Sequence, residues 1–146
     1  MSAAEHHEGH CLCGAVTVKV DGPVGDISAC HCEMCTRWSG SVQMGAEVDR
    51  DRVAIAGPVA TYQSSEFAER AWCQACGSAV WFKDTVGENE HIFELAPGLF
   101  DGFGGARLVR VVYCDRAAGG VRLAGDLDRM TKAEYEAQFP FVEDSA

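Results

Sequence analysis

Seven of the eight cysteines in this chain of 146 residues lie in three short motifs whose spacing suits metal binding. The motifs are Cys11-x-Cys13, Cys30-x-Cys32-x-x-Cys35 and Cys73-x-x-Cys76, and Cys114 stands alone. Thiolates at such intervals can surround one ion with little bending of the backbone, and zinc takes sulfur ligands in tetrahedral geometry at about 2.3 Å. A site with four protein thiolates is closed and structural, whereas a site with three leaves one position for a small molecule.

Spacing alone does not determine which motifs share an ion. One grouping places four thiolates in a closed site, which we term the four-cysteine cluster: Cys11, Cys13, Cys73 and Cys76. The remaining motif then forms a three-cysteine cluster: Cys30, Cys32 and Cys35. Its fourth position could be open, or Cys114 could fill it, with His31 as a weaker candidate. A second grouping would pair Cys32 and Cys35 with Cys73 and Cys76, as in a zinc ribbon.

Charge and composition exclude several classes of partner. The chain has 22 acidic and 12 basic residues, for a net charge of -10, which argues against nucleic acid and against an anionic membrane surface. No apolar run is long enough to cross a membrane, and residues 1–7 lack the basic and apolar regions of a signal peptide. We therefore expect a cytoplasmic protein, in which clustered cysteines point to metal or redox chemistry instead of disulfides.

The elements that must position these cysteines are expected to be mostly short strands. Alternating apolar and polar residues predict a strand over residues 16–20. Further strands are predicted over residues 27–30, 41–45, 53–56, 69–73, 78–82, 91–95 and 108–113, with residues 62–67 extended. The sequence Cys73-x-x-Cys76-Gly77 joins two of these strands and predicts a zinc knuckle, in which Gly77 permits the backbone conformation after the turn.

Only the C-terminal part of the chain is expected to be helical. Thr131 and Glu134 form a capping box, and Met130 and Tyr135 are spaced as the hydrophobic staple beside it. This helix is predicted to run to about residue 138, before Pro140. The polar residues 1–9 are expected to form a flexible N-terminal arm, and residues 10–146 a single domain.

The three cysteine motifs and their neighbours resemble the glutathione-dependent formaldehyde-activating enzyme family, also called the centromere protein V family. The similar stretches are residues 11–16, 30–40 and 73–78, and their order and spacing cover roughly residues 9–125. The resemblance implies a β-tent fold of short antiparallel strands with zinc knuckles, as in methionine sulfoxide reductase B and a Rab-binding zinc protein. Residues 110–120 lack the His-Ile and Pro-Trp pattern expected there.

The resemblance also implies two Zn²⁺ ions per chain and a role for each cluster. The four-cysteine cluster (Cys11, Cys13, Cys73, Cys76) matches the structural zinc ligands, and the three-cysteine cluster (Cys30, Cys32, Cys35) matches the catalytic ones. The implied activity is that of an S-(hydroxymethyl)glutathione synthase-like carbon–sulfur lyase, with glutathione or another small thiol adding reversibly to formaldehyde or another aldehyde. The alternatives are a non-catalytic binding module stabilised by zinc and a thiol redox sensor.

Two residues that follow the three-cysteine motif are candidates for binding the thiol substrate. Arg37 and Ser39 could contact a glutathione carboxylate. A solvated loop would equally account for both residue types.

Overall fold

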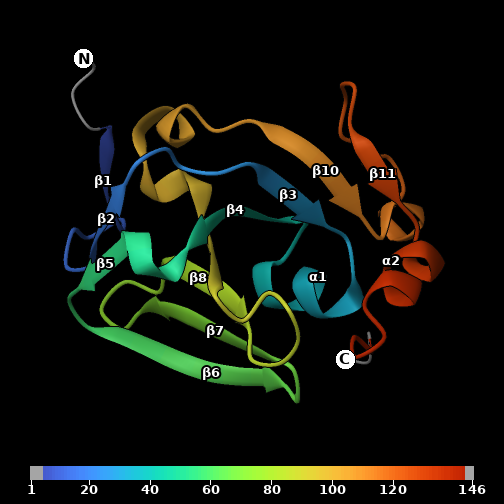
Figure 1. The fold of residues 1–146 in the computed structure, drawn as a ribbon, viewed down its shortest axis with the longest axis horizontal. Helices are drawn as coiled ribbons and strands as arrows, with labels where there is room; N and C mark the ends of the chain where they lie inside the picture. Colours follow the sequence, from blue (N-terminus) through green and yellow to red (C-terminus); the bar gives the residue numbers. More distant parts are fainter. Residues whose placement is uncertain (1–4, 144–146) are drawn as a thin grey trace. The chain divides into compact units, whose positions relative to one another are not determined.

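The structure is a computed structural model that describes residues 5–143, which contain eleven β-strands and two α-helices (Figure 1). The strands are β1 (His6–His10), β2 (Thr17–Asp21), β3 (Ile27–Cys30), β4 (Gln43–Asp49), β5 (Val53–Ala56), β6 (Val59–Ser65), β7 (Ala68–Cys73), β8 (Ala79–Asp84), β9 (Ile92–Leu95), β10 (Leu108–Val112) and β11 (Asp128–Met130). The helices are α1 (Glu33–Ser39) and α2 (Lys132–Gln138). The predicted mainly-β fold class is therefore confirmed.

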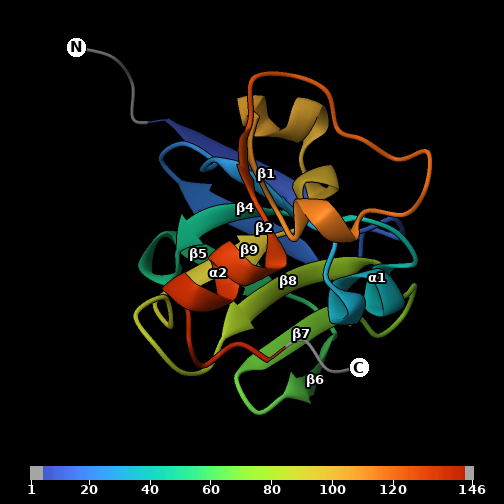
Figure 2. The same ribbon diagram turned by 90° about the vertical axis from the view of Figure 1, so that its right-hand side faces the viewer.

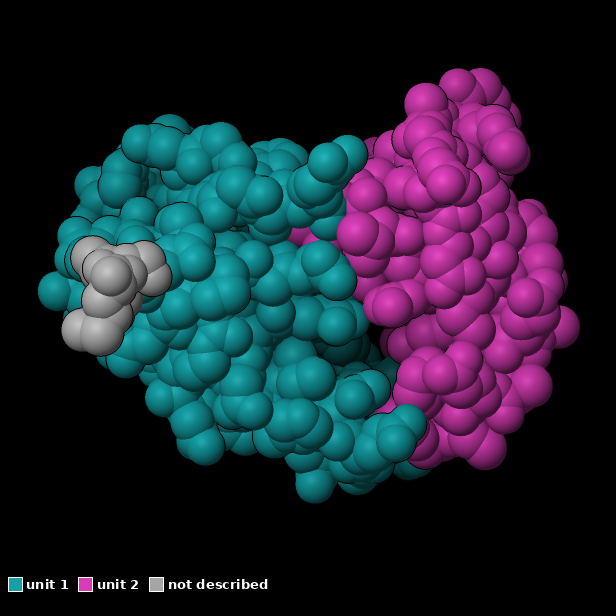
Figure 3. Space-filling view, turned by 45° about the horizontal axis from the view of Figure 1, so that its top comes forward, with its two compact units in different colours: residues 1–26, 45–107 teal, residues 27–44, 108–146 magenta. Residues whose placement is uncertain are grey.

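The chain divides into two compact units, coloured separately in Figure 3. The first contains residues up to 26 together with 45–107, and the second contains residues 27–44 together with those from 108 onwards. The four-cysteine cluster belongs to the first unit and the three-cysteine cluster to the second. The prediction of a single domain over residues 10–146 stays a prediction.

The first unit is built from antiparallel strands. Strand β2 pairs with β1 on one side and with β5 on the other, and its side chains alternate between buried valines and exposed polar residues. Strands β4, β9, β8, β7 and β6 pair in that order, each antiparallel to the next. Val18 and Val20 are fully buried, as the period of two in the sequence requires.

Strand β1 corrects the prediction of a flexible arm over residues 1–9. Residues 6–9 pair with β2 in register, with Gly9 opposite Val18, while residues 1–4 lie outside the described residues. A Cβ on Gly9 would lie 2.6 Å from the carbonyl oxygen of Leu99, so the glycine permits a close approach to a distant segment. The polar composition of this strand gave no sign of either contact.

The second unit contains parallel pairs, an exception to the antiparallel arrangement that the resemblance implied. Strand β10 lies between β3 and β11 and is parallel to both (Figure 1). Val112 is opposite Cys30 on one side and Met130 on the other. This pairing brings the end of β10 beside the start of the three-cysteine motif.

Helix α1 also corrects the prediction that only the C-terminal part of the chain is helical (Figure 2). Its N-cap is Cys32, whose Sγ accepts a hydrogen bond from the backbone N–H of Cys35. Gly40 ends the helix in the left-handed conformation, with φ 82°, and donates its N–H to the carbonyl of Thr36. A thiol thus takes the capping place that Ser, Thr, Asp or Asn usually occupies.

Helix α2 confirms the N-cap predicted at Thr131, and the Thr131 hydroxyl also donates to Glu134 Oε1 at 3.1 Å. Thr131 is the N-cap, and its hydroxyl oxygen accepts a hydrogen bond from the N–H of Glu134 at 3.2 Å. None of the helices in residues 5–143 has the length and apolar character that crossing a membrane would require.

Candidate metal centres

The four-cysteine cluster brings together two turns that are far apart in the sequence. The Sγ atoms of Cys11, Cys13, Cys73 and Cys76 all lie within 4.8 Å of one another. Cys13 Sγ lies 3.6 Å from Cys11 Sγ and 3.8 Å from Cys73 Sγ, although 60 positions separate Cys13 from Cys73. This geometry could hold a metal ion, and it groups Cys73 and Cys76 with Cys11 and Cys13, in favour of the first grouping over the zinc ribbon.

The turn between β7 and β8 presents its two sulfurs as the knuckle motif predicts. The N–H of Cys73 donates to the carbonyl of Ser78, and the N–H of Gly77 donates to the carbonyl of Cys73, both at 2.8 Å. Gly77 has a φ of 81°, which side chains with a Cβ rarely adopt. The tight turn brings the thiols of Cys73 and Cys76 close to those of Cys11 and Cys13.

Hydrogen bonds donated to sulfur favour the negatively charged thiolate form in this cluster. The N–H of Val16 donates to Cys11 Sγ at 3.3 Å. The hydroxyl and backbone N–H of Ser78 lower the pKa of Cys76 to about 5. For Cys13, the N–H of Ala15 lowers the pKa, but desolvation and the neighbouring thiols outweigh it and raise the value to about 11. A thiolate at Cys76 is thus favoured without a metal, whereas several thiolates in one cluster require a cation to offset their repulsion.

The three-cysteine cluster is formed by one continuous stretch in the second unit. Cys30 ends β3, Cys32 caps α1, and Cys35 lies in the first turn of that helix. Their Sγ atoms lie within 4.8 Å of one another. The N–H of Cys32 donates to Cys30 Sγ at 3.4 Å, and the N–H of Cys35 donates to Cys32 Sγ at 3.3 Å. The end of β3 and the capped start of α1 therefore bring the three sulfurs together.

The pKa values of Cys30 and Cys32 are raised, so these two thiols hold their protons in the absence of a cation. The adjacent thiols of Cys32 and Cys35, followed by burial, raise the pKa of Cys30 well above its ordinary value. Cys30 lowers the pKa of Cys32 by hydrogen bonding, but Cys35 and burial outweigh this and raise it to about 12. Cys32 and Cys35 are only 5% and 7% exposed. The cluster therefore suits a soft divalent cation, which displaces protons when it binds.

No fourth His, Cys, Asp or Glu ligand joins this group within residues 5–143. Cys114 follows β10 in the same unit, in a short 3-10 helix, but its sulfur is not one of the grouped ligand atoms. His31 is buried, and its backbone N–H donates to the carbonyl of Val112 at 3.2 Å. Neither of the two candidate fourth ligands is therefore placed in the cluster.

The two candidate substrate-binding residues have partners in α1 and in the residues just after it. The guanidinium of Arg37 donates to Glu33 Oε1 at 3.0 and 3.2 Å, an exposed pair one turn apart. The hydroxyl oxygen of Ser39 lies 2.8 Å from the carbonyl oxygen of Cys35 and 2.7 Å from that of Ser41, and its single hydrogen can be donated to either. Both contacts stabilise the helix and its end.

A small buried core lies against the three-cysteine cluster, and the sequence motifs did not reveal it. Cys32 and Cys35 share this core with Val112 and Tyr113. Partly buried side chains complete it: Cys30, Met34, Met130 and Tyr135. Only the staple spacing of Met130 and Tyr135 signalled that this part of the chain packs, and nothing local indicated what it packs against.

Comparison with known proteins places the chain in a family. The model of the glutathione-dependent formaldehyde-activating enzymes matches residues 6–116. The chain belongs to this family. Among its relatives is an uncharacterized lyase of Schizosaccharomyces pombe, 37% identical over 86 residues, a match that covers 58% of this chain and 63% of that protein. Another is a Halomonas elongata protein provisionally named a glutathione-dependent formaldehyde-activating enzyme, 32% identical over 87 residues, covering 53% of this chain and 55% of the relative.

The matches thus span less than two thirds of the length of these relatives. A crystal structure of a Rhodobacter sphaeroides protein is similar with a TM-score of 0.55 and 19% identity, covering 70% of this chain and 99% of the other. At this level of identity, the likeness shows a shared fold.

Proposed function

We propose that this protein is a zinc-dependent carbon–sulfur lyase or synthase that activates a small thiol for reversible addition to an aldehyde. The observation that carries the proposal is the three-cysteine cluster: three converging thiols, with no fourth ligand among residues 5–143. Family membership supplies the reaction class, since the family is described by glutathione and formaldehyde. Cys30, Cys32 and Cys35 are the proposed catalytic metal ligands.

The donor set of this cluster fits zinc. Soft thiolate ligands at a site without oxygen donors favour Zn²⁺ over hard cations such as Mg²⁺ or Ca²⁺. When bound, Zn²⁺ supplies the acidity that converts an incoming thiol, with an ordinary pKa near 8.5, into a nucleophilic thiolate. A cluster closed by four protein ligands would offer no place for that thiol.

The residues of the chain have two tasks in this reaction. The N–H groups of Cys32 and Cys35 donate to sulfur and hold the thiolates in place. The buried core behind the cluster keeps water from that side of the sulfurs. In the reaction, the substrate sulfur forms a bond to the carbonyl carbon while the carbonyl π electrons move to oxygen. That oxygen gains a proton from solvent, which balances the proton released by the thiol.

The four-cysteine cluster is proposed to hold a second Zn²⁺ with a structural role. Four thiolates complete a tetrahedral site, so no position remains for a substrate. The ion would fasten the turn before β2 to the turn between β7 and β8. Cys11, Cys13, Cys73 and Cys76 are accordingly assigned to stability and not to chemistry.

The thiol proposed is glutathione and the aldehyde formaldehyde, giving S-hydroxymethylglutathione. Both substrates are small molecules, and nucleic acid and membranes are not proposed as partners. A cytoplasmic location and a single domain over residues 10–146 complete the proposal.

The test is an NMR exchange measurement between glutathione, formaldehyde and their adduct, with and without protein of known zinc content. We expect faster exchange with the protein, and loss of the acceleration in Cys32→Ser. The matched control is Cys114→Ser, which changes a cysteine of the same unit outside the cluster and should retain both the acceleration and two zinc ions. Exchange no faster than the spontaneous reaction would refute the proposed activity, and loss of one zinc in Cys114→Ser would make the second site a closed one.

A further inference from the structure

We infer that Tyr113 is a positioning residue for the three-cysteine cluster, held in place by the C-terminal segment of β11 and α2. The inference rests on the proposed metal binding by this cluster and not on the reaction. The family match ends at residue 116, whereas β11 and α2 lie at residues 128–138. This segment therefore adds to the family's site something that the matched region does not contain.

Tyr113 has an unusual backbone conformation beside the cluster. It is one of two non-glycine residues with positive φ in residues 5–143, at φ 55° and ψ 39°. This left-handed conformation is unfavourable for a side chain with a Cβ. Strained backbone of this kind persists where surrounding contacts hold it, and it is concentrated at functional sites. The residue before it, Val112, is paired with Cys30 and accepts the N–H of His31.

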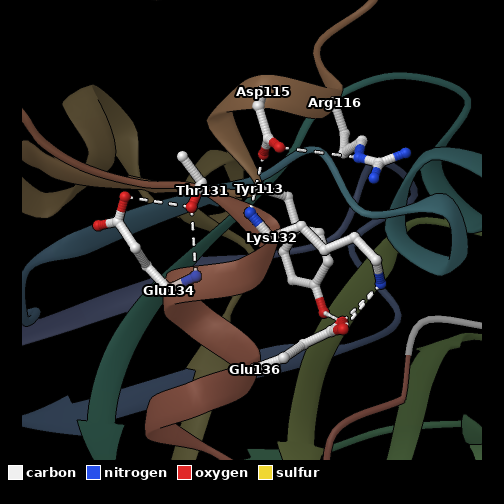
Figure 4. A network of polar contacts seen from close by, with 7 residues as sticks. All are labelled: Tyr113, Asp115, Arg116, Thr131, Lys132, Glu134 and Glu136. Carbon is white, nitrogen blue, oxygen red and sulfur yellow. Dashed lines mark hydrogen bonds and ion pairs between the residues drawn. The ribbon is translucent and has the colours of Figure 1, made fainter.

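The side chain of Tyr113 connects the cluster to α2. The residue is 1% exposed and lies in the same buried core as Cys32 and Cys35. Its ring lies 5.5 Å from the ring of Tyr135, centroid to centroid. Its hydroxyl donates to Glu136 Oε2 at 3.1 Å (Figure 4). The tyrosine thus shares a core with the cysteines, while its hydroxyl is bonded to the helix.

Charged groups on α2 and at the end of β10 fix the orientation of this tyrosine. Lys132 Nζ lies 2.8 and 2.5 Å from the two carboxylate oxygens of Glu136, one turn along the helix, and 5.5 Å from the centre of the Tyr113 ring. The backbone N–H of Lys132 donates to Asp115 Oδ1 at 2.8 Å (Figure 4). The start of α2 is therefore tied to the residue two positions after Tyr113. Rotation of the ring away from the cluster would break the bond to Glu136.

Two conservative variants test this inference in the full-length protein. Tyr113→Phe keeps the ring and removes the hydroxyl, and Glu136→Gln keeps the shape and removes the charge. The matched control is Tyr62→Phe, the same change on β6 in the first unit, where the side chain is exposed. Each protein is loaded with cadmium-113 at both clusters and examined by NMR, so that the four-cysteine signal serves as an internal reference.

We expect both variants to shift or broaden the signal of the three-cysteine cluster and to leave the four-cysteine signal in place. Release of cadmium from the three-cysteine cluster to a chelator should become about two- to tenfold faster, as the loss of one hydrogen bond predicts. Tyr62→Phe should change neither quantity. Unchanged signals and rates in both variants would overturn the inference, as would equal effects on both clusters, which indicate general loosening. Failure of the unaltered protein to bind a second cadmium ion would refute the metal proposal itself, and this inference with it.

Discussion

Removal of Cys73 and Cys76, the two cysteines on one side of the four-cysteine cluster, should cost the protein much of its stability. A metal ion held by both turns acts as a cross-link between segments separated by 60 positions, measured from Cys13 to Cys73. In the chain-entropy treatment of cross-links, a loop of that length contributes about 4 kcal/mol to the free energy of unfolding. This is a large part of the roughly 5–15 kcal/mol that stabilises a typical domain. The double variant Cys73→Ala, Cys76→Ala leaves no ligand on one side and opens the loop.

The three-cysteine cluster provides a matched comparison. Its ligands span only six residues, from Cys30 to Cys35. Closing so short a loop contributes about 2 kcal/mol in the same treatment. The double variant Cys32→Ala, Cys35→Ala should therefore lose about half as much stability as the first double variant, with the same number of thiols removed.

The assay is urea unfolding followed by tryptophan fluorescence, with and without a strong chelator. Trp72 and Trp81 lie on β7 and β8, next to the four-cysteine cluster, so they report on the first unit. The free energy of unfolding of the zinc-loaded protein should exceed that of the Cys73→Ala, Cys76→Ala variant by about 4 kcal/mol. Removal of the metal by the chelator should reduce that difference to less than about 1 kcal/mol. A difference that survives chelation, or equal losses in the two double variants, would refute the assignment of a structural role to the first cluster.

Two further predictions concern stability away from the clusters. Burial raises the pKa of Asp84 to about 6 from 3.8, so the folded protein loses stability as pH rises through that interval. The variant Asp84→Asn should therefore be about 1–2 kcal/mol more stable than the unaltered protein at pH 7 and equal to it below pH 4. Urea unfolding at both pH values checks this, and the same stability difference at both would contradict it. A Cβ on Gly25 would lie 1.7 Å from the carbonyl oxygen of Glu47, so Gly25→Ala should lower the free energy of unfolding by about 3 kcal/mol in the same assay. The control is Gly119→Ala, where an added Cβ would meet no heavy atom within 4 Å, and its loss should be less than about 1 kcal/mol.

Sequence motifs predicted those elements that are stabilised by interactions between residues close in the sequence. Thr131 and Glu134 satisfy each other within four residues, so the start of α2 could be read directly from the capping box. The turn with Gly77 was readable for the same reason, because its sulfurs, its hydrogen bonds and its positive φ lie within a few residues. Helix α1 was missed because its N-cap is the thiol of Cys32, which is not among the usual capping residues. Two local signs of it were nevertheless present: the pair Glu33 and Arg37 one turn apart, and Gly40 beyond its end.

Long-range contacts account for the rest of what the sequence did not predict. Strand β1 is polar and owes its structure to pairing with β2 and to the contact between Gly9 and Leu99. The parallel pairing of β10 with β3 joins residues about 80 positions apart, and alternation within a strand carries no sign of which partner it will have. The grouping of the cysteines into four and three was similarly open, because spacing fixes which thiols can share an ion only within one motif.

The two clusters place the same residue type in different surroundings, which favour the different roles proposed for them. In the first unit, the ligands come from two turns, and a bound ion would close a long loop, which makes stability the expected consequence. In the second, the end of β3 and the start of α1 place the three sulfurs within one continuous stretch, so the ion is not needed to join distant segments, and the proposed function assigns its fourth position to the substrate. Because all three ligands come from one short stretch, contacts from other parts of the fold are needed to hold that stretch in place. Tyr113, within the family match, and Glu136, beyond it, are the residues inferred to supply that support. Differences among family members in the C-terminal segment should therefore alter how firmly the three-cysteine cluster holds its metal, without any change in the cysteines themselves.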